Sequence, residues 1–182
     1  MTESPERQNR TFFNSQFVRT EKRRSYRLAF VLFWSILMYL FFSHYVISLG
    51  IIREASMVPT LPEGGYYLVN KYIYYFTRPK RGDIIILRQD VHTPEIVKRV
   101  VGLEGETLVI KGGHVYINGR RLSEHYALGP TYPDFGPYRI EKDTYFILGD
   151  NREVSQDSRN FGAVLFRNIE GKIRPGVLFP FY

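Results

Sequence analysis

The sequence predicts an all-β domain, built of twisted and partly closed antiparallel sheets, preceded by one N-terminal transmembrane helix. Two observations predict this organisation. Residues 28–52 form an apolar run with no Asp, Glu, Lys or Arg. The residues after it alternate short segments rich in β-branched and aromatic side chains with Gly, Pro and Asn turn signals, a spacing typical of small antiparallel sheet domains.

The apolar run is long enough to be a membrane anchor. About 20 apolar residues cross the hydrocarbon core as a helix, and a slightly longer run crosses with some tilt. A cleaved leader would have an apolar region of only about 7–15 residues. The alternative is a helix buried in a soluble domain, and it is disfavoured because a helix that packs on a small soluble core keeps a polar face, which this run lacks. We therefore expect an uncleaved transmembrane anchor over residues 28–52.

The charges on the two sides of the run predict its orientation. Residues 1–27 hold seven Lys and Arg against three Asp and Glu, a net +4, and four of these basic residues immediately precede the run: Lys22, Arg23, Arg24 and Arg27. Because positive flanks stay on the cytoplasmic side, residues 1–27 should be a cytoplasmic basic tail and residues 53–182 an extracytoplasmic domain. Residues 53–182 carry eighteen basic and fifteen acidic residues, without a compact basic stripe. A nucleic-acid partner is therefore not expected.

The expected strands follow one another in short steps. Gly112-Gly113 and Asn118-Gly119 predict tight hairpin turns, and residues 123–138, rich in Pro and Gly, predict an irregular loop. The aromatic stretch 72–76 has two readings, a strand packed in the core or a patch that rests on lipid headgroups, where Tyr is favoured. The strands are expected at residues 66–71, 83–87, 96–101, 108–110, 115–117, 120–122, 144–148, 169–174 and 177–181.

Ser56 and Lys98 are the candidate catalytic residues. A serine hydroxyl is a weak nucleophile until a base removes its proton. Lys98 lies in the apolar segment 96–101 and shares a face with Ile96 and Val100. Burial there would lower its pKa toward about 7–8, a shift of about 3 units that corresponds to about 4 kcal/mol. The alternative is a lysine at a strand edge whose amine reaches solvent.

Other nucleophile chemistries find less support in the sequence. The chain has no cysteine, which excludes a thiol nucleophile, a thiolate metal site and disulfides. The four histidines lie in the apolar run or in turns and loops, without an accompanying catalytic signature, and no His, Asp or Glu cluster has metal-ligand spacing. We therefore expect no metal and no cofactor. The polar loop 149–159 is either a tight turn whose Asp and Asn bind their own backbone, or a segment whose Ser155 or Asp157 positions the lysine.

Four segments together resemble the ordered boxes of bacterial type I signal peptidases. They are residues 56–61 (SMVPTL), 81–85 (RGDII), 98–106 (KRVVGLEGE) and 149–162 (GDNREVSQDSRNFG). The resemblance runs from about residue 53 to about residue 175. It implies a membrane-bound serine endopeptidase with a Ser/Lys dyad that removes N-terminal signal peptides from exported preproteins after small residues. It also implies an all-β fold with a second subdomain, which should be reduced here because the stretch before residue 144 is short.

The same resemblance assigns roles to residues. Ser56 would be the nucleophile, with its backbone N–H as an oxyanion donor, and Lys98 the general base. Ser155 would hydrogen-bond the Lys98 amine and orient it, while Asp157 and Arg159 would brace the site as a structural pair. Glu54 departs from the hydroxyl residue that some members place two residues before the nucleophile. Either Glu54 points away and the backbone serves, or the oxyanion hole is completed differently. The residues that bind substrate stay unidentified.

The resemblance implies a location and leaves alternatives open. The chain should be a single-pass protein of the bacterial cytoplasmic (inner) membrane with its catalytic domain on the outer face, and its partners should be secretory preproteins and the lipid bilayer. One alternative is a specialised maturation peptidase of a transfer or pilus system. Another is a catalytically inactive, membrane-anchored binding protein of the same fold.

Overall fold

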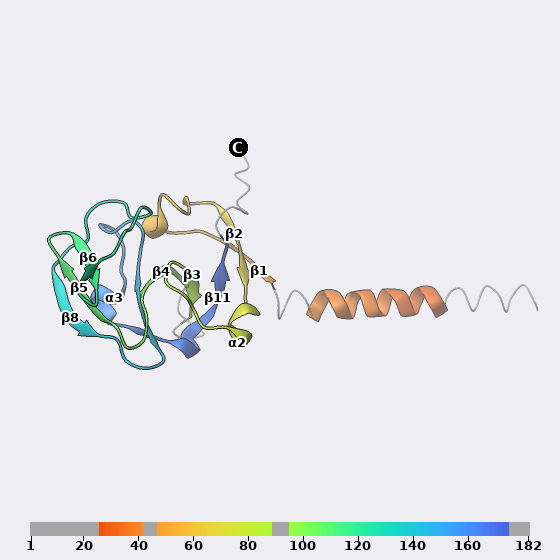
Figure 1. The fold of residues 1–182 in the computed structure, drawn as a ribbon. Helices are drawn as coiled ribbons and strands as arrows, with labels where there is room; N and C mark the ends of the chain where they lie inside the picture. Colours follow the sequence, from red (N-terminus) through yellow and green to blue (C-terminus); the bar gives the residue numbers. More distant parts are fainter. Residues whose placement is uncertain (1–25, 42–46, 89–94, 175–182) are drawn as a thin grey trace, which may run out of the picture. The chain divides into compact units, whose positions relative to one another are not determined.

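The computed structural model describes residues 26–41, 47–88 and 95–174. Contacts divide the chain into two units, Met1–His44 and Tyr45–Tyr182 (Figure 1). In the first unit residues 26–41 are helical, and the apolar side chains of this helix, such as Phe30, Trp34 and Leu37, are exposed. Within the described ranges no helix combines the length and apolar character needed to cross a membrane.

The sequence predicted a helix over the whole apolar run, to residue 52. This prediction is wrong for the end of the run. Ile47–Ile51 is strand β1, which pairs antiparallel with β2 (Tyr66–Asn70) along its whole length. The backbone N–H and C=O groups of this segment therefore find their hydrogen-bond partners in a neighbouring strand instead of in a helical turn. Gly50 permits a close approach, since a Cβ at this residue would lie 2.3 Å from the Tyr67 ring. The rest of the predicted span after residue 41, residues 42–46, lies outside the described residues.

The second unit is built from two antiparallel sheets, which confirms the predicted all-β class. The larger sheet has the order β1-β2-β11-β3-β4-β9-β10, and the smaller has the order β7-β6-β5-β8 (Figure 1). The remaining strands are β3 (Ile84–Leu87), β4 (Ile96–Gly102), β5 (Thr107–Lys111), β6 (His114–Ile117), β7 (Arg120–Arg121), β8 (Phe135–Arg139), β9 (Thr144–Leu148), β10 (Val164–Leu165) and β11 (Ile169–Ile173).

The centre of the larger sheet is buried on both faces. Ile84 and Ile86 of β3 pack into one hydrophobic cluster, and Ile85 and Leu87 pack into a second cluster on the opposite face. A third cluster joins β4 and β9 to the smaller sheet through side chains that include Phe146. Strand β4, between β3 and β9, therefore runs through the most buried part of the unit, and any charged side chain on it must find a partner inside the protein.

Most predicted strands are present within one or two residues. The hairpin between β5 and β6 turns at Gly112 and Gly113, whose φ values of 58° and 81° fit the expected tight turn. The irregular loop expected at residues 123–138 is present up to residue 134, and only its end was predicted wrongly, because residues 135–138 belong to β8. Pro137 has no N–H to donate, and β8 tolerates it because β8 is an edge strand of the smaller sheet. The strand predicted at 177–181 lies outside the described residues.

The aromatic stretch 72–76 is not a strand, and only part of it packs in the core. Residues Ile73–Phe76 form the short helix α2, which Asn70 fastens to the end of β2 by accepting hydrogen bonds from the backbone N–H groups of Tyr72 and Ile73. Tyr74 is buried and donates to Asp83. The other aromatic side chains of the stretch, Tyr72, Tyr75 and Phe76, are exposed and lie against one another.

Candidate active site

Ser56 lies on a single helical turn that a distant loop holds in place. The turn is η1 (Ala55–Met57), and the Ser56 side chain is buried. The backbone N–H of Asn151 donates to the Ser56 carbonyl (3.0 Å), and its side-chain amide donates to the Ala55 carbonyl (3.3 Å). These two bonds fix the position of the serine relative to the polar loop 149–159.

Lys98 lies beside Ser56, inside the protein. The Lys98 side chain is 1% exposed, and its Nζ is 2.7 Å from Ser56 Oγ. The alternative of a lysine that reaches solvent is thus excluded. Burial lowers the pKa of Lys98, against the opposing effect of the carboxylates of Glu54 and Asp157. A buried amine with a lowered pKa in contact with a hydroxyl has the arrangement that a general base needs.

Asp157 and Arg159 form the predicted ion pair. Asp157 begins α3 (Ser158–Phe161) and is fully buried. Arg159 donates to its two oxygens from Nε (2.8 Å) and Nη2 (2.9 Å). The backbone N–H of Gly149 donates to the same carboxylate (3.0 Å). The pair therefore ties the two ends of the polar loop together beside the Ser56 turn.

Ser155 does not make the predicted hydrogen bond to Lys98. Its hydroxyl is buried and has no hydrogen-bond partner among the residues that the structure describes. The side chain is nevertheless close to the dyad, because a Cβ at Gly149 would lie 2.2 Å from Ser155 Oγ and 2.6 Å from the Ser56 carbonyl oxygen. The amine is directed at Ser56 Oγ in this structure, and the unpaired hydroxyl costs about 1–3 kcal/mol.

A buried polar network behind the dyad was missed by the sequence analysis. Arg99 follows Lys98 on β4 and binds both oxygens of Asp150, from Nε (2.7 Å) and Nη2 (2.6 Å). Thr60 donates to Asp150 (2.5 Å) and accepts from Arg99 (3.2 Å). The signal was a second cation inside an apolar strand, which requires a buried anion.

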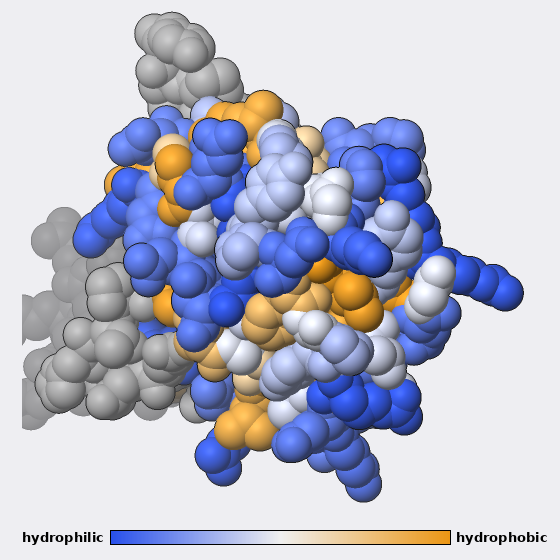
Figure 2. All heavy atoms as spheres, turned by 90° about the vertical axis from the view of Figure 1, so that its left-hand side faces the viewer, coloured by the Kyte–Doolittle hydropathy of each residue, from blue (hydrophilic) through white to orange (hydrophobic). Residues whose placement is uncertain are grey.

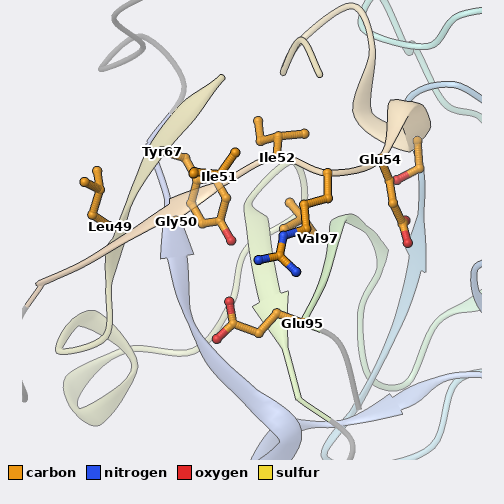
Figure 3. Close-up of a pocket in the computed structure, with 10 residues that line it drawn as sticks. Leu49, Gly50, Ile51, Ile52, Glu54, Tyr67, Glu95 and Val97 are labelled. Atoms are coloured by element: carbon orange, nitrogen blue, oxygen red, sulfur yellow. The ribbon is translucent and has the colours of Figure 1, made fainter. Parts of the chain in front are cut away.

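A groove passes Ser56. It has a volume of about 650 Å³, and its lining residues come mainly from β1 and from the segment that joins β1 to Ser56. Figure 3 shows the side chains of both walls. The Oε2 atom of Glu54, in this lining, lies 4.0 Å from Lys98 Nζ. The lining residues are Leu49, Gly50, Ile51, Ile52, Arg53, Glu54, Ser56, Tyr67, Glu95 and Val97.

The described histidines lie elsewhere. His114 contacts Arg121, and His125 contacts Ser123, both in or beside the smaller sheet. His44 and His92 lie outside the described residues. In the ranges that the structure covers, no group of three His, Cys, Asp or Glu could hold a metal ion.

Comparison with known proteins identifies the family. The model of the family "Signal peptidase, peptidase S26" matches residues 25–177, which include every residue of the dyad and its supporting network. The chain belongs to the signal peptidase family. Members of this family are serine peptidases. The serine that contacts Lys98 is therefore found in a family whose enzymes use a serine.

Several relatives in the signal peptidase family match most of the chain. Signal peptidase I of Bacillus amyloliquefaciens is 37% identical over 150 residues, which is 76% of this chain and 77% of the relative. Signal peptidase I T of Bacillus subtilis is 37% identical over 158 residues and 81% of each chain. The crystal structure of a signal peptidase I from Enterococcus faecalis matches at 33% identity and a TM-score of 0.48, over 54% of this chain and 98% of that one.

Proposed function

We propose that the chain is a membrane-bound serine endopeptidase that cleaves N-terminal signal peptides from exported preproteins, with Ser56 as nucleophile and Lys98 as general base. The observation that carries the assignment is the 2.7 Å contact between Lys98 Nζ and Ser56 Oγ inside a buried site. An ammonium cannot accept a proton, so the lowered pKa of Lys98 supports its role as base.

The reaction follows from these two atoms. The neutral Lys98 amine accepts the Ser56 proton while Ser56 Oγ bonds to the carbonyl carbon of the peptide. The resulting ammonium returns the proton to the departing amine as the C–N bond breaks, which leaves an ester on Ser56. A water molecule then gives a proton to Lys98 and attacks the ester, and the proton returns to Ser56 Oγ as the new carboxyl product leaves.

The supporting residues have distinct parts in this proposal. The backbone N–H of Ser56 is the proposed donor to the oxyanion, since the carboxylate of Glu54 accepts hydrogen bonds and cannot donate one when ionised. Ser155 is the proposed orienting hydroxyl for Lys98, supported by its burial close to Ser56 and its unused hydrogen-bonding capacity. Asp157 and Arg159 hold the loop that carries Ser155.

An extended peptide fits the edge available at the groove. Residues 96–98 of β4 pair with β3 on one side, whereas pairing with β9 begins at Arg99. A peptide that adds to such an edge turns alternate side chains toward the protein. The resemblance to signal peptidases implies small residues immediately before the cut and again two residues earlier, and this alternation agrees with a peptide paired to such an edge.

Two observations support a bilayer as a partner. The charge-free sequence continues beyond the helix at residues 26–41, with a basic flank before it, which supports a single-pass anchor whose basic N-terminal tail is cytoplasmic. Strand β1 sets the limit of that anchor before Ile47. The exposed ring cluster of Tyr72, Tyr75 and Phe76 supports contact of the domain with headgroups on the outer face of the bacterial cytoplasmic membrane.

Cleavage of a preprotein by the detergent-solubilised full chain tests the function. Wild type should release the mature protein, and Ser56→Ala should not. An inactive binding protein of the same fold would show no cleavage that depends on Ser56. A panel of preproteins then separates a general peptidase, which cleaves many of them, from a maturation peptidase dedicated to one substrate of a transfer or pilus system.

A further inference from the structure

Glu54 lies at the same time against the general base and in the groove. Its Oε2 is 4.0 Å from Lys98 Nζ, although the Glu54 side chain is 71% exposed and the Lys98 side chain is 1% exposed. The same residue is one of those that line the groove beside Ser56 (Figure 3). The sequence left open whether Glu54 points away from the dyad. In the structure its carboxylate is directed toward the Lys98 amine.

The other charged groups near the amine are already balanced. Asp157 is the second carboxylate that acts on Lys98, but Arg159 binds it through two N–H groups and the backbone N–H of Gly149 binds it as well. The remaining elements packed around Lys98 present uncharged side chains toward it. These are Ser56 on η1 and Ile85 at the paired position of β3.

Asp157 has Arg159 as its cation, whereas Glu54 has no cation partner other than Lys98 in the part of the chain that the structure describes. Among the described residues Lys98 is its only ion-pair or hydrogen-bond partner. Its negative charge therefore acts on Lys98 without local balance, screened only by solvent. An anion near an amine favours the ammonium form, and an anion near a carbonyl that is under attack disfavours the oxyanion.

We propose that Glu54 is a positioning residue that restrains the dyad: it holds part of the Lys98 population in the charged form and so moves the working range of the enzyme to higher pH. This inference rests on the proposed Ser56/Lys98 function and adds a residue-specific control of it. Glu54 touches the base and does not take part in bond making. Removal of its charge therefore changes the pH at which the dyad becomes active and leaves the reaction pathway as it was.

The pH dependence of kcat/KM tests this, because it reports the ionisation of groups in the free enzyme. Wild-type activity should rise with pH as Lys98 loses its proton. In Glu54→Gln the rising limb should move to lower pH by about half a unit to one unit, the size expected for two unit charges about 4 Å apart in water. Glu54→Asp, which keeps the charge, should restore a limb closer to wild type. Because Glu54 is exposed, the difference should shrink at high ionic strength.

Glu63→Gln is the matched control, since Glu63 is exposed in a turn outside the groove and its replacement changes the net charge by the same amount. It should leave the limb in place. A rising limb at the same pH in wild type and Glu54→Gln would overturn the proposal. So would an equal displacement in Glu63→Gln, which would indicate a general effect of net charge.

A titration that needs no turnover separates this proposal from the proposed function. The full chain with ¹³C-labelled lysine is followed by NMR in detergent, and the Lys98 signal is assigned by its absence in Lys98→Arg. Its midpoint should be lower in Glu54→Gln than in wild type. If the midpoint falls but the chain cleaves no preprotein, the peptidase assignment fails and the coupling stands. If the chain is active and the midpoint is unchanged, the coupling is wrong.

Discussion

Arg99 and Asp150 form a buried, two-contact ion pair that joins the three segments of the active site. The Arg99 guanidinium binds both Asp150 oxygens, and Asp150 is fully buried. Thr60, four residues after the nucleophile, donates to the same carboxylate. The guanidinium also lies over the Tyr126 ring, 4.0 Å from its centroid. Thr60, Arg99 and Asp150 thus connect the segment of the nucleophile, the strand of the base and the start of the polar loop in one network.

The first prediction is that Asp150→Ala is strongly destabilising. It leaves the Arg99 charge buried without its anion, a situation that costs about 3–5 kcal/mol. Denaturant unfolding of the solubilised chain measures the loss. The double variant Arg99→Met/Asp150→Ala should recover part of it, because no buried charge is then unpaired.

Arg78→Ala is the control for this series, since it breaks an ion pair to Asp143 whose side chains are 59% and 46% exposed. Exposed pairs contribute about 0–1 kcal/mol. Equal losses for Asp150→Ala and Arg78→Ala would contradict a structural role for the buried network.

The second prediction concerns the identity of the base. Lys98→Arg should be inactive at every accessible pH, because a guanidinium stays protonated. Lys98→Ala should be inactive as well, and combining it with Ser56→Ala should cost little more than either change alone, because nucleophile and base act as a unit. Preprotein cleavage by the purified variants is the measurement. Appreciable cleavage by Lys98→Arg would rule out the lysine as base.

The third prediction concerns stability and pH. Burial lowers the pKa of Lys98 in the folded chain, and unfolding returns it toward 10.5. Between the two values the unfolded chain binds more protons, so the free energy of unfolding of wild type rises with pH there. Lys98→Met lacks this dependence. Its stability relative to wild type should therefore be greatest at low pH and should fall as the pH approaches about 10, by about 1.4 kcal/mol per unit of pKa lowering.

Denaturant unfolding of wild type and Lys98→Met at about pH 6, 8 and 10 covers this interval. A difference in stability that stays constant from the lowest to the highest pH would show that the pKa of Lys98 is not lowered by folding.

The sequence predicted the strands well and their ends less well, for identifiable reasons. Ile84–Leu87 and Thr144–Leu148 are β-branched and aromatic segments with turn signals around them, and local preference agrees with the fold. The apolar composition of Ile47–Ile51 suits a membrane helix and a sheet strand equally well. Composition alone therefore did not show where the helix ends and β1 begins. In β8, Pro137 indicated a loop, and only the pairing with β5 reveals an edge strand.

In the candidate site, too, some features were predicted from the sequence and others were not. The segments that carry Ser56 and Lys98 were found because each residue type has a chemical reason to be there, and the structure brings them to 2.7 Å. The direction of Glu54 depends on the path of the chain between β1 and η1, and the partner of Arg99 lies 51 residues away. The apolar strand around Arg99 indicates that a buried anion is needed, but nothing near Arg99 in the sequence indicates which one, and the direction of Glu54 has no local signal at all.

The fourth prediction tests the aromatic cluster of α2 as a lipid contact. Tyr75→Ser/Phe76→Ser should raise the KM for a preprotein in vesicles, because the domain loses apolar contact at the headgroup level where the cleavage site lies. Cleavage of a soluble peptide should not change. Leu165→Ser is the matched control, since Leu165 is exposed on β10, at the opposite edge of the sheet from β1. If the control raised the KM for vesicle-bound preprotein equally, the effect would not belong to α2.

The fifth prediction concerns the residues that the groove accepts before the scissile bond. An extended peptide along residues 96–98 of β4 would turn its first and third residues before the bond toward the groove and its second toward solvent. Replacing the small residue next to the bond by Leu should therefore stop processing, whereas the same change at the second position should be tolerated. Val97 lines the groove, so Val97→Ala should recover part of the processing of the bulky substrate. Equal tolerance of bulk at the first and second positions would contradict pairing of the peptide with β4, even if Ser56 and Lys98 perform the chemistry.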